Sequence, residues 1–325
     1  MADVVTVDAA ERAVEIAGRT PWQITRARIA RDKITIAAFF ASVFFILLAL
    51  AAPVLTHFGL LDPYSSNTDL VGGLGSLPIG PMGGVSADHW MGVEPGTGRD
   101  LFSRVVSGLT VSLIVATLAV TVSVVLGVVI GIVSGSAGGR VDWFFSRVTD
   151  FVLSFPQTLM LIALSTIAID AIQGLLGTDR TIPSMVFMIL VMGFFGWPIF
   201  ARIIRGQVLS LKEREFIEAA HSLGAKRFRI YFKELLPHLW APILVYTTLV
   251  MPQNIATEAA LGFLGVGIQA PTPSFGSILN DSVHYATSNP AYFVFPGVTL
   301  FLVVLSFNLL GDGLRDALDP KADRQ

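Results

Sequence analysis

The chain contains no cysteine, and only 14% of its 325 residues are charged. The absence of cysteine excludes disulfides, thiolate metal sites and a cysteine nucleophile. The charged fraction lies well below the roughly 25% of ordinary soluble domains, whereas 53% of the residues are hydrophobic. This composition argues against a soluble enzyme and favours a membrane protein.

Motifs for nucleotide binding and metal chemistry are also missing. There is no G-x-x-x-x-G-K-[ST] loop to hold nucleotide phosphates and no H-E-x-x-H zinc motif. The histidines are scattered without ligand-like spacing, at His57, His89, His221, His238 and His284. We therefore expect a non-catalytic chain that binds no metal or cofactor, and no nucleic-acid partner.

Six apolar runs are each long enough to cross a membrane, since a helix needs about 20 apolar residues to span the hydrocarbon core. They cover residues 34–55, 109–132, 148–169, 183–204, 239–261 and 291–310. The predicted fold is an all-α integral membrane protein with six spans inside a domain of residues 34–310. A polar N-terminal segment of residues 1–33 and a tail of residues 311–325 flank this domain.

The distribution of positive charge predicts the orientation. With six spans, both termini lie on one side, together with the segment between the fourth and fifth spans. Nearly all of the 22 Lys and Arg residues fall on that side, and Arg99, Arg104 and Arg180 are the exceptions. Because cytoplasmic loops carry the excess of Lys and Arg, both termini are predicted to be cytoplasmic, and the loop of residues 56–108 faces outward.

Local signals add detail to three of these segments. Residues 20–33 are typical of a helix at the membrane surface, with Thr20 as its N-cap. Arg99 and Asp100 are typical of a helix start. In the second span Gly127, Gly131 and Gly135 recur at every fourth residue, and such spacing predicts close contact with another helix.

The segment between the fourth and fifth spans, residues 206–237, is predicted to form a basic helical hairpin. Apolar residues at helical spacing indicate two short amphipathic helices. Gly224 lies between them, where a chain reversal favours a residue that tolerates positive φ. The hairpin is either a solvated loop or a docking element, and Phe216, Leu223 and Phe228 favour docking because exposed apolar clusters mark interaction sites.

The fifth span contains an ionisable residue, Glu258, with Asn254 one turn earlier and Gln253 beside it. A charge at the middle of a span costs about 2.5–3.5 kcal/mol on insertion scales, so Glu258 should face protein or water. Two interpretations remain open. The three residues line a translocation pathway between subunits, or Glu258 makes a structural hydrogen bond to the outer loop.

The sequence E-A-A-x-x-x-G at residues 218–224, followed by Leu236 and Pro237, resembles the cytoplasmic motif of permease subunits in bacterial ABC importers. Further stretches, HWMGVEPGTGRDLFSRVVSG, TEAALGFLGVGIQAPTPSFG and NLLGDGLRDALDPK, resemble the C-type subunits of the oligopeptide, dipeptide and nickel permeases. The likeness extends over residues 20–321. The sequence departs from the family at Val93 and Glu94, near Thr97, and at Glu234.

This resemblance implies the type I importer permease fold and a place in the bacterial inner membrane. It implies four kinds of partner: a homologous B-type permease, two ATPase subunits that use ATP and Mg²⁺, an extracytoplasmic substrate-binding protein, and membrane lipid. The hairpin would couple to an ATPase through residues that carry its turn, its small contacts and its apolar or charged rim: Phe216, Glu218, Ala219, Ala220, Leu223, Gly224, Ala225, Lys226 and Arg227.

The predicted function is ATP-driven import of di- and oligopeptides, with this chain forming half of the pathway. Nickel, glutathione and sugars remain alternative cargoes. Two functions of other classes are also considered. A self-sufficient secondary transporter would leave the basic hairpin unexplained, and a membrane scaffold or sensor would show no transport.

Overall fold

The computed structural model describes residues 25, 26, 28–73 and 75–318, and helices make up most of this part. The helices that form its body and its two ends are α3 (Lys33–His57), α4 (Leu101–Ala137), α5 (Gly139–Ser154), α6 (Gln157–Leu176), α7 (Thr181–Leu211), α8 (Glu215–Ser222), α9 (Arg227–Arg229), α10 (Trp240–Phe263), α11 (Phe275–Val283) and α12 (Pro290–Leu318). Shorter elements are η1 (Thr68–Leu70), β1 (Val71–Gly72), β2 (Leu77–Pro78), η2 (Pro81–Gly83), η3 (Ile230–Leu235) and η4 (Leu236–His238).

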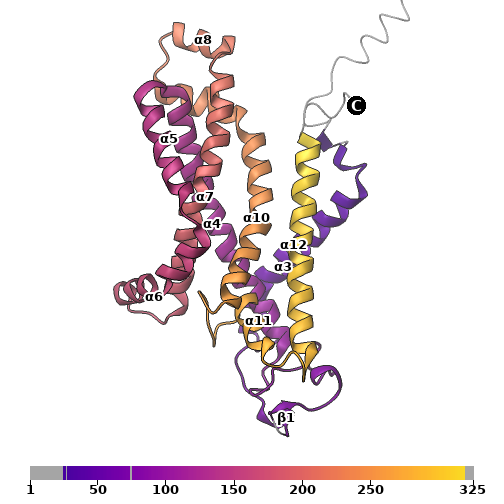
Figure 1. Ribbon diagram of the computed structural model, residues 1–325. Helices are drawn as coiled ribbons and strands as arrows, with labels where there is room; N and C mark the ends of the chain where they lie inside the picture. Colours follow the sequence, from indigo (N-terminus) through magenta and orange to yellow (C-terminus); the bar gives the residue numbers. More distant parts are fainter. Residues whose placement is uncertain (1–24, 27, 74, 319–325) are drawn as a thin grey trace, which may run out of the picture.

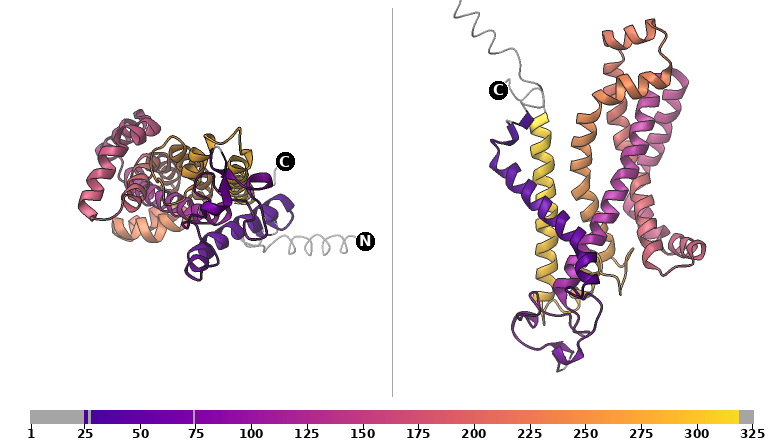
Figure 2. Two further views of the ribbon diagram at one scale, coloured as in Figure 1. Left: turned by 90° about the horizontal axis from the view of Figure 1, so that it is seen from below. Right: turned by 180° about the vertical axis from the view of Figure 1, so that it is seen from behind.

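The long helices run side by side between two differently built ends (Figures 1 and 2). One end carries α8 and the last turns of α12, and the other carries α11 and the antiparallel pair β1–β2. The N-terminal end of α3 lies at the same end as α8. The start of α3, the end of α12 and the hairpin helix α8 thus share one end of the described part.

Five helices of the described part are long and apolar enough to cross a membrane: α3, α4, α6, α7 and α12. The number reaches six if the bent pair Arg227–His238 and Trp240–Phe263, with an angle of 63° between its halves, counts as one span. The predicted all-α membrane fold is therefore confirmed, and the predicted fifth span lies in this bent pair.

The predicted third span, residues 148–169, is wrong as a single helix. The chain breaks between α5 and α6, where Phe155 has an extended conformation with φ −87° and ψ 128°. Pro156 causes the break, because its ring disfavours helical geometry at the preceding residue and it has no N–H to donate. After the break, α6 projects away from the body of the bundle (Figure 1).

The glycine stripe of the second span holds α4 close against α7. A Cβ atom at Gly131 would lie 2.8 Å from Cβ of Ile204, and one at Gly135 would lie 2.9 Å from Cβ of Val208. Real Cβ atoms essentially never come this close, so any larger residue would push the two helices apart. The predicted packing role is confirmed, and it joins the hairpin-proximal part of α7 firmly to α4.

Several helices extend beyond the predicted spans. Helix α4 begins at Leu101 and has 37 residues, α7 continues to Leu211, and α12 continues to Leu318. The predicted hairpin therefore loses its first residues to α7, and the predicted tail loses its first residues to α12. Hydropathy marks only the apolar middle of such helices, since their polar ends extend past the membrane core.

The predicted surface helix of residues 20–33 can be followed only in part. Thr20 lies outside the described residues. Nearer to α3, Arg28 Nη1 donates a hydrogen bond of 3.4 Å to the carbonyl of Ala317, at the end of α12. Asp32 caps α3 by accepting a hydrogen bond from the Ile34 amide at 2.9 Å.

Candidate functional site

The hairpin turns at Gly224, which has φ +74°. Just before it, α8 ends with a bond of 3.0 Å from the Ala225 amide to the Ala220 carbonyl. This six-residue closure around a left-handed residue is the Schellman arrangement of a helix C-terminus. The prediction of a chain reversal that uses positive φ at Gly224 is confirmed.

The second arm of the hairpin is less regular than expected. One amphipathic helix was predicted there, but the chain forms the short α9, then the π-helical η3 and the 3₁₀-helical η4. Pro237 lies in η4, where it interrupts regular α-helical hydrogen bonding. This interruption coincides with the bend that leads into α10.

The base of the hairpin is anchored in the bundle. Ile217 of α8 and Ile230 of η3 are buried, at 2% and 3% exposure. They join one apolar cluster with side chains of α4, α7, η3 and the start of α10: Ile132, Ile204, Val208, Leu235, Leu239 and Ile243. Because protein interiors of this kind are close-packed and transmit strain, a force on the hairpin reaches α4 and α7 without first deforming a loop.

The opposite face of the hairpin is open to solvent. Leu223 is 88% exposed and Phe228 is 72% exposed. Between the two arms lies a groove with a volume of about 570 Å³. Its lining consists of residues from both arms: Phe216, Ala219, Ala220, Leu223, Gly224, Ala225, Lys226, Arg229 and Glu234.

Seven of the nine residues predicted for coupling line this groove, and the two others, Glu218 and Arg227, are exposed nearby. Within the described part of the chain the Glu218 carboxylate has no hydrogen bond or ion pair, so it stays available to a partner. An anchoring role for Glu218 remains a prediction.

Sequence reasoning missed two residues of the groove lining, Arg229 and Glu234, whose charged groups lie 4.0 Å apart within the second arm. It also missed His238, which stacks on the groove residue Phe216 with 4.7 Å between ring centroids. The contact between Phe216 and His238 depends on how the two arms fold back on each other. The departure from the family at Glu234 was the one available signal, because a charge in place of an apolar residue requires an opposite charge or water.

The polar residues of the fifth span do not share one environment. Glu258 is fully buried and Asn254 is 8% exposed, whereas Gln253 is exposed. Ser112 of α4 donates a hydrogen bond to Oε2 of Glu258. This contact favours the structural interpretation for Glu258, with a side chain of the neighbouring helix α4 as its partner. The pathway role of the three residues stays a prediction, and only Gln253 lies on an exposed surface here.

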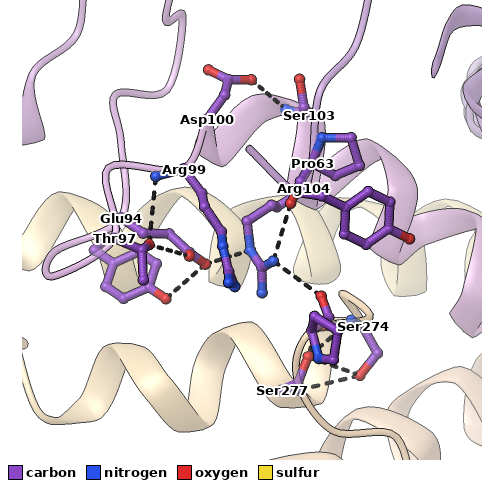
Figure 3. Close-up of polar contacts among 12 residues, drawn as sticks. Pro63, Glu94, Thr97, Arg99, Asp100, Ser103, Arg104, Ser274 and Ser277 are labelled. Carbon is purple, nitrogen blue, oxygen red and sulfur yellow. Dashed lines mark hydrogen bonds and ion pairs between the residues drawn. The ribbon is translucent and has the colours of Figure 1, made fainter. Parts of the chain in front are cut away.

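At the other end, the outer loop is held by a buried ion pair between Glu94 and Arg104 (Figure 3). Tyr292 of α12 donates a hydrogen bond of 3.0 Å to Oε1 of Glu94, and Thr97 donates one of 3.1 Å to Oε2. The Arg104 guanidinium donates to the carbonyls of Pro63 and Pro271, at 3.2 and 3.3 Å. We call these residues the outer clasp.

The start of α4 lies directly beside the outer clasp. Asp100 is the N-cap and accepts a hydrogen bond of 2.7 Å from the Ser103 amide. This confirms the prediction that the Arg99–Asp100 pair marks a helix start. His89 lies 2.9 Å from the other carboxylate oxygen of Asp100. The loop before α4 is therefore an ordered structure, in which Glu94, a departure from the family pattern, holds a central position.

Ion pairs also connect α5 to α7 near the hairpin. Arg205 donates to both carboxylate oxygens of Asp142, at 2.5 and 2.7 Å. These hydrogen bonds hold the pKa of the Asp142 carboxyl below its ordinary value, against the opposing effect of burial. Arg202 contacts Asp150 at 2.6 Å. The pairs hold α5 against the part of α7 that continues toward the hairpin.

Comparison with known proteins agrees with this architecture. Residues 127–324 match the family described as binding-protein-dependent transport system inner membrane component. The chain is 39% identical to the dipeptide transport system permease protein DppC of Alkalihalophilus pseudofirmus, over 93% of this chain and 90% of that protein. It is 38% identical to the glutathione transport system permease protein GsiD of Salmonella typhimurium, over 93% and 91%.

Among solved structures, the chain resembles the methionine ABC transporter MetNI in an inward-facing conformation. The TM-score is 0.52 at 20% identity, and the match covers 67% of this chain and 98% of that chain. At this identity the likeness shows the fold alone, and that fold is the predicted type I importer permease fold. Taken together, the match over residues 127–324 and the full-length relatives show that the chain belongs to the inner-membrane permease subunits of binding-protein-dependent ABC importers.

Proposed function

We propose that this chain is the permease subunit through which an ATP-driven importer moves di- and oligopeptides across the bacterial inner membrane. It forms half of the translocation pathway, and a homologous B-type permease forms the other half. Two ATPase subunits supply the energy and use ATP and Mg²⁺, while an extracytoplasmic binding protein delivers the cargo. This chain itself supplies part of the translocation pathway and couples it mechanically to an ATPase subunit.

The hairpin carries this proposal. It combines an exposed groove, suited to another protein, with a base packed against α4, α7 and α10. Closure of the ATPase pair would move such an element as a rigid body. The attached helices would then rock between inward-open and outward-open states, as expected when one bundle moves against another.

The coupling residues divide by chemistry. Gly224 makes the turn, while Ala219 and Ala220 allow close approach of the partner. Leu223 and Phe216 supply apolar contact area, and Glu218 anchors by hydrogen bonds. Lys226 and Arg227 lie at the rim, where exposed ion pairs contribute roughly 1 kcal/mol or less.

The distribution of Lys and Arg supports the proposed orientation. In it the hairpin, residues 1–33 and residues 311–325 lie in the cytoplasm, and the loop of residues 56–108 faces outward. The outer clasp then lies on the side where the binding protein delivers its cargo.

Peptides are the proposed cargo because relatives at 36–39% identity carry the names of dipeptide and glutathione permeases. Glutathione is the second candidate, and it is itself a small peptide with a free amino group and free carboxylates. Nickel remains an alternative that no feature of the described residues favours.

Uptake by purified complex in proteoliposomes tests the proposal. The complex of both permeases and both ATPases is reconstituted with ATP on the ATPase side and the binding protein, loaded with labelled dipeptide, on the other. We expect dipeptide accumulation that requires ATP and that glutathione competes to a measurable extent. Accumulation by this chain without ATPase subunits would instead show a secondary transporter, and absence of any transport would favour a scaffold or sensor.

A further inference from the structure

An apolar groove lies between the first and the last long helix of the described part. Helices α3 and α12 are neighbours at one edge of the bundle (Figures 1 and 2). The groove has a volume of about 510 Å³, and its lining extends from Lys33 to Phe45 in α3 and from Leu302 to Leu309 in α12. Both helices are long and apolar enough to cross a membrane, so the groove faces the hydrocarbon of the bilayer.

Small side chains beside large ones create this groove. Ala37 and Ala41 line it within α3, and Phe44 and Leu302 beside them are 58% and 46% exposed. Ser306 also lines it, but its hydroxyl donates a hydrogen bond of 2.8 Å to the Val303 carbonyl. Since that hydroxyl is satisfied within α12, the middle of the groove suits an apolar ligand.

One end of the groove carries a positive charge. Lys33 is exposed and is the first residue of α3, where the helix dipole adds a partial positive charge. The neighbouring carboxylate of Asp32 is engaged, because it accepts hydrogen bonds from the Ile34 amide and the Thr35 hydroxyl. Within the described residues the Lys33 side chain makes no ion pair and no hydrogen bond. This end therefore favours an anionic ligand.

Contacts between the two helices hold this charged end in place. Gly313 of α12 lies against Thr35 of α3, and a Cβ atom at Gly313 would overlap the Thr35 side chain. Asp312 and Asp316 of α12 are exposed, but neither lines the groove. Lys33 is thus the charged side chain of the lining.

The dimensions favour an alkyl chain over another helix as the occupant. A single helical turn, with a diameter of about 10 Å and a rise of about 5.4 Å, occupies on the order of 400 Å³. The groove has little more volume than one such turn, although its lining extends from Lys33 to Phe45, which is more than three turns. A groove this long and narrow accommodates a single chain of carbon atoms.

We propose that this groove binds one acyl chain of an anionic phospholipid, and that Lys33 binds the phosphate of its headgroup. In the proposed orientation Lys33 lies at the cytoplasmic leaflet, where anionic lipids are attracted to basic residues beside membrane helices. The bound chain fills the space between α3 and α12 and stabilises their contact. The inference uses the proposed orientation, but it depends on neither the cargo nor ATP hydrolysis.

Photo-crosslinking with two lipid probes tests the proposal. The complex of both permeases and both ATPases is reconstituted in phosphatidylcholine vesicles with a trace of phosphatidylglycerol or phosphatidylcholine that carries a diazirine in one acyl chain. After irradiation, the crosslinked residues of α3 and α12 are mapped by mass spectrometry. The two probes have the same acyl chains, so the ratio of their yields within the groove measures selection of the anionic headgroup.

We expect the wild type to be labelled within the groove, with a phosphatidylglycerol-to-phosphatidylcholine ratio of about five, the effect of one basic residue near an anionic headgroup. Lys33→Gln should bring this ratio to about one, and Lys33→Arg should retain it. Ala41→Leu fills the groove and should reduce labelling by both probes, without changing their ratio.

Two substitutions outside the groove serve as matched controls. Lys212 is an exposed lysine on the same proposed side of the membrane, and Ala51 is a half-buried alanine of α3. Neither residue lines the groove. Lys212→Gln should therefore leave the ratio at the wild-type value, and Ala51→Leu should leave the yields within the groove unchanged.

Equal yields of the two probes in the wild type, or an unchanged ratio in Lys33→Gln, would overturn the inference. Absence of labelling within the groove of the assembled complex would also overturn it. If the isolated chain were then labelled there, a helix of another subunit would be the occupant. Should Ala41→Leu fail to assemble, Ala37→Val replaces it, and full labelling of that variant would contradict binding in the groove.

Discussion

At the hairpin, apolar side chains such as Leu223 lie almost fully exposed and the carboxylate of Glu218 has no partner in the described chain. At the outer end, Arg104 and Glu94 are 0% and 3% exposed and bind each other. The two ends thus differ in opposite directions. The hairpin exposes apolar side chains to solvent, whereas the outer clasp buries charged side chains.

This difference indicates which end needs a partner protein. Exposed apolar area on an otherwise well-packed element marks a protein-binding surface. A buried ion pair must be satisfied within its own chain, because an uncompensated buried charge is strongly destabilising. The hairpin end therefore depends on a partner, whereas the outer clasp holds its loop without one.

The largest expected effect is at the outer clasp. Arg104→Ala leaves Glu94 buried without its cation and should destabilise the protein by about 3–5 kcal/mol. Denaturant unfolding of the detergent-solubilised chain measures this loss. Arg180→Ala removes an exposed pair and should cost roughly 1 kcal/mol or less. Similar losses in the two variants would show that the outer clasp is not a buried structural element.

The next largest effect is expected at the turn of the hairpin, where adding a methyl group should lower the free energy of unfolding. Gly224 has φ +74° and open space around it, so Gly224→Ala introduces backbone strain of about 1–2 kcal/mol without a clash. Gly206, in α7, also has open space but no positive φ. Gly206→Ala should be neutral or stabilising by up to about 1 kcal/mol. Thermal unfolding of both variants tests this contrast, and equal signs would contradict it.

The smallest effect concerns acid and the α5–α7 pair. Because folding lowers the pKa of Asp142, its stabilising contribution is present above the unfolded pKa of about 3.9 and is lost as the pH falls through the folded pKa. Asp142→Asn should remove that acid dependence and cost roughly 1 kcal/mol at neutral pH. Stability measured from pH 7 to 3 shows the difference, with Asp179→Asn as the exposed control. If Asp142→Asn lost stability between pH 7 and 3 in the same way as the wild type, the Asp142–Arg205 pair would not be stabilising.

Local sequence signals predicted local structure well. The apolar runs marked the long helices, Asp100 marked the start of α4, and Gly131 and Gly135 marked its contact with α7. Gly224 marked the turn of the hairpin. Each of these depends on a few neighbouring residues or on a fixed helical spacing, and both are visible in a sequence.

The features that the sequence did not predict depend on distant partners or on competing effects. Pro156 can lie within a membrane helix when neighbouring groups satisfy the freed carbonyl, so its presence alone did not predict the break between α5 and α6. Glu94 and Tyr292 are far apart in the chain, and nothing in either segment predicts that they meet. The position of Glu258 against Ser112 likewise required the packing of α4 on α10.

The most direct test of the account is co-purification of the tagged full-length chain from gently solubilised membranes, with Glu218→Arg and Glu213→Arg compared. Both variants make the same charge change in exposed residues, but only Glu218 lies beside the groove, in α8. We predict that wild type and Glu213→Arg retain the second permease and the ATPase subunits. Glu218→Arg should lose the ATPases while keeping the permease. Full retention of the ATPases by Glu218→Arg would contradict the assignment of the hairpin as the docking surface.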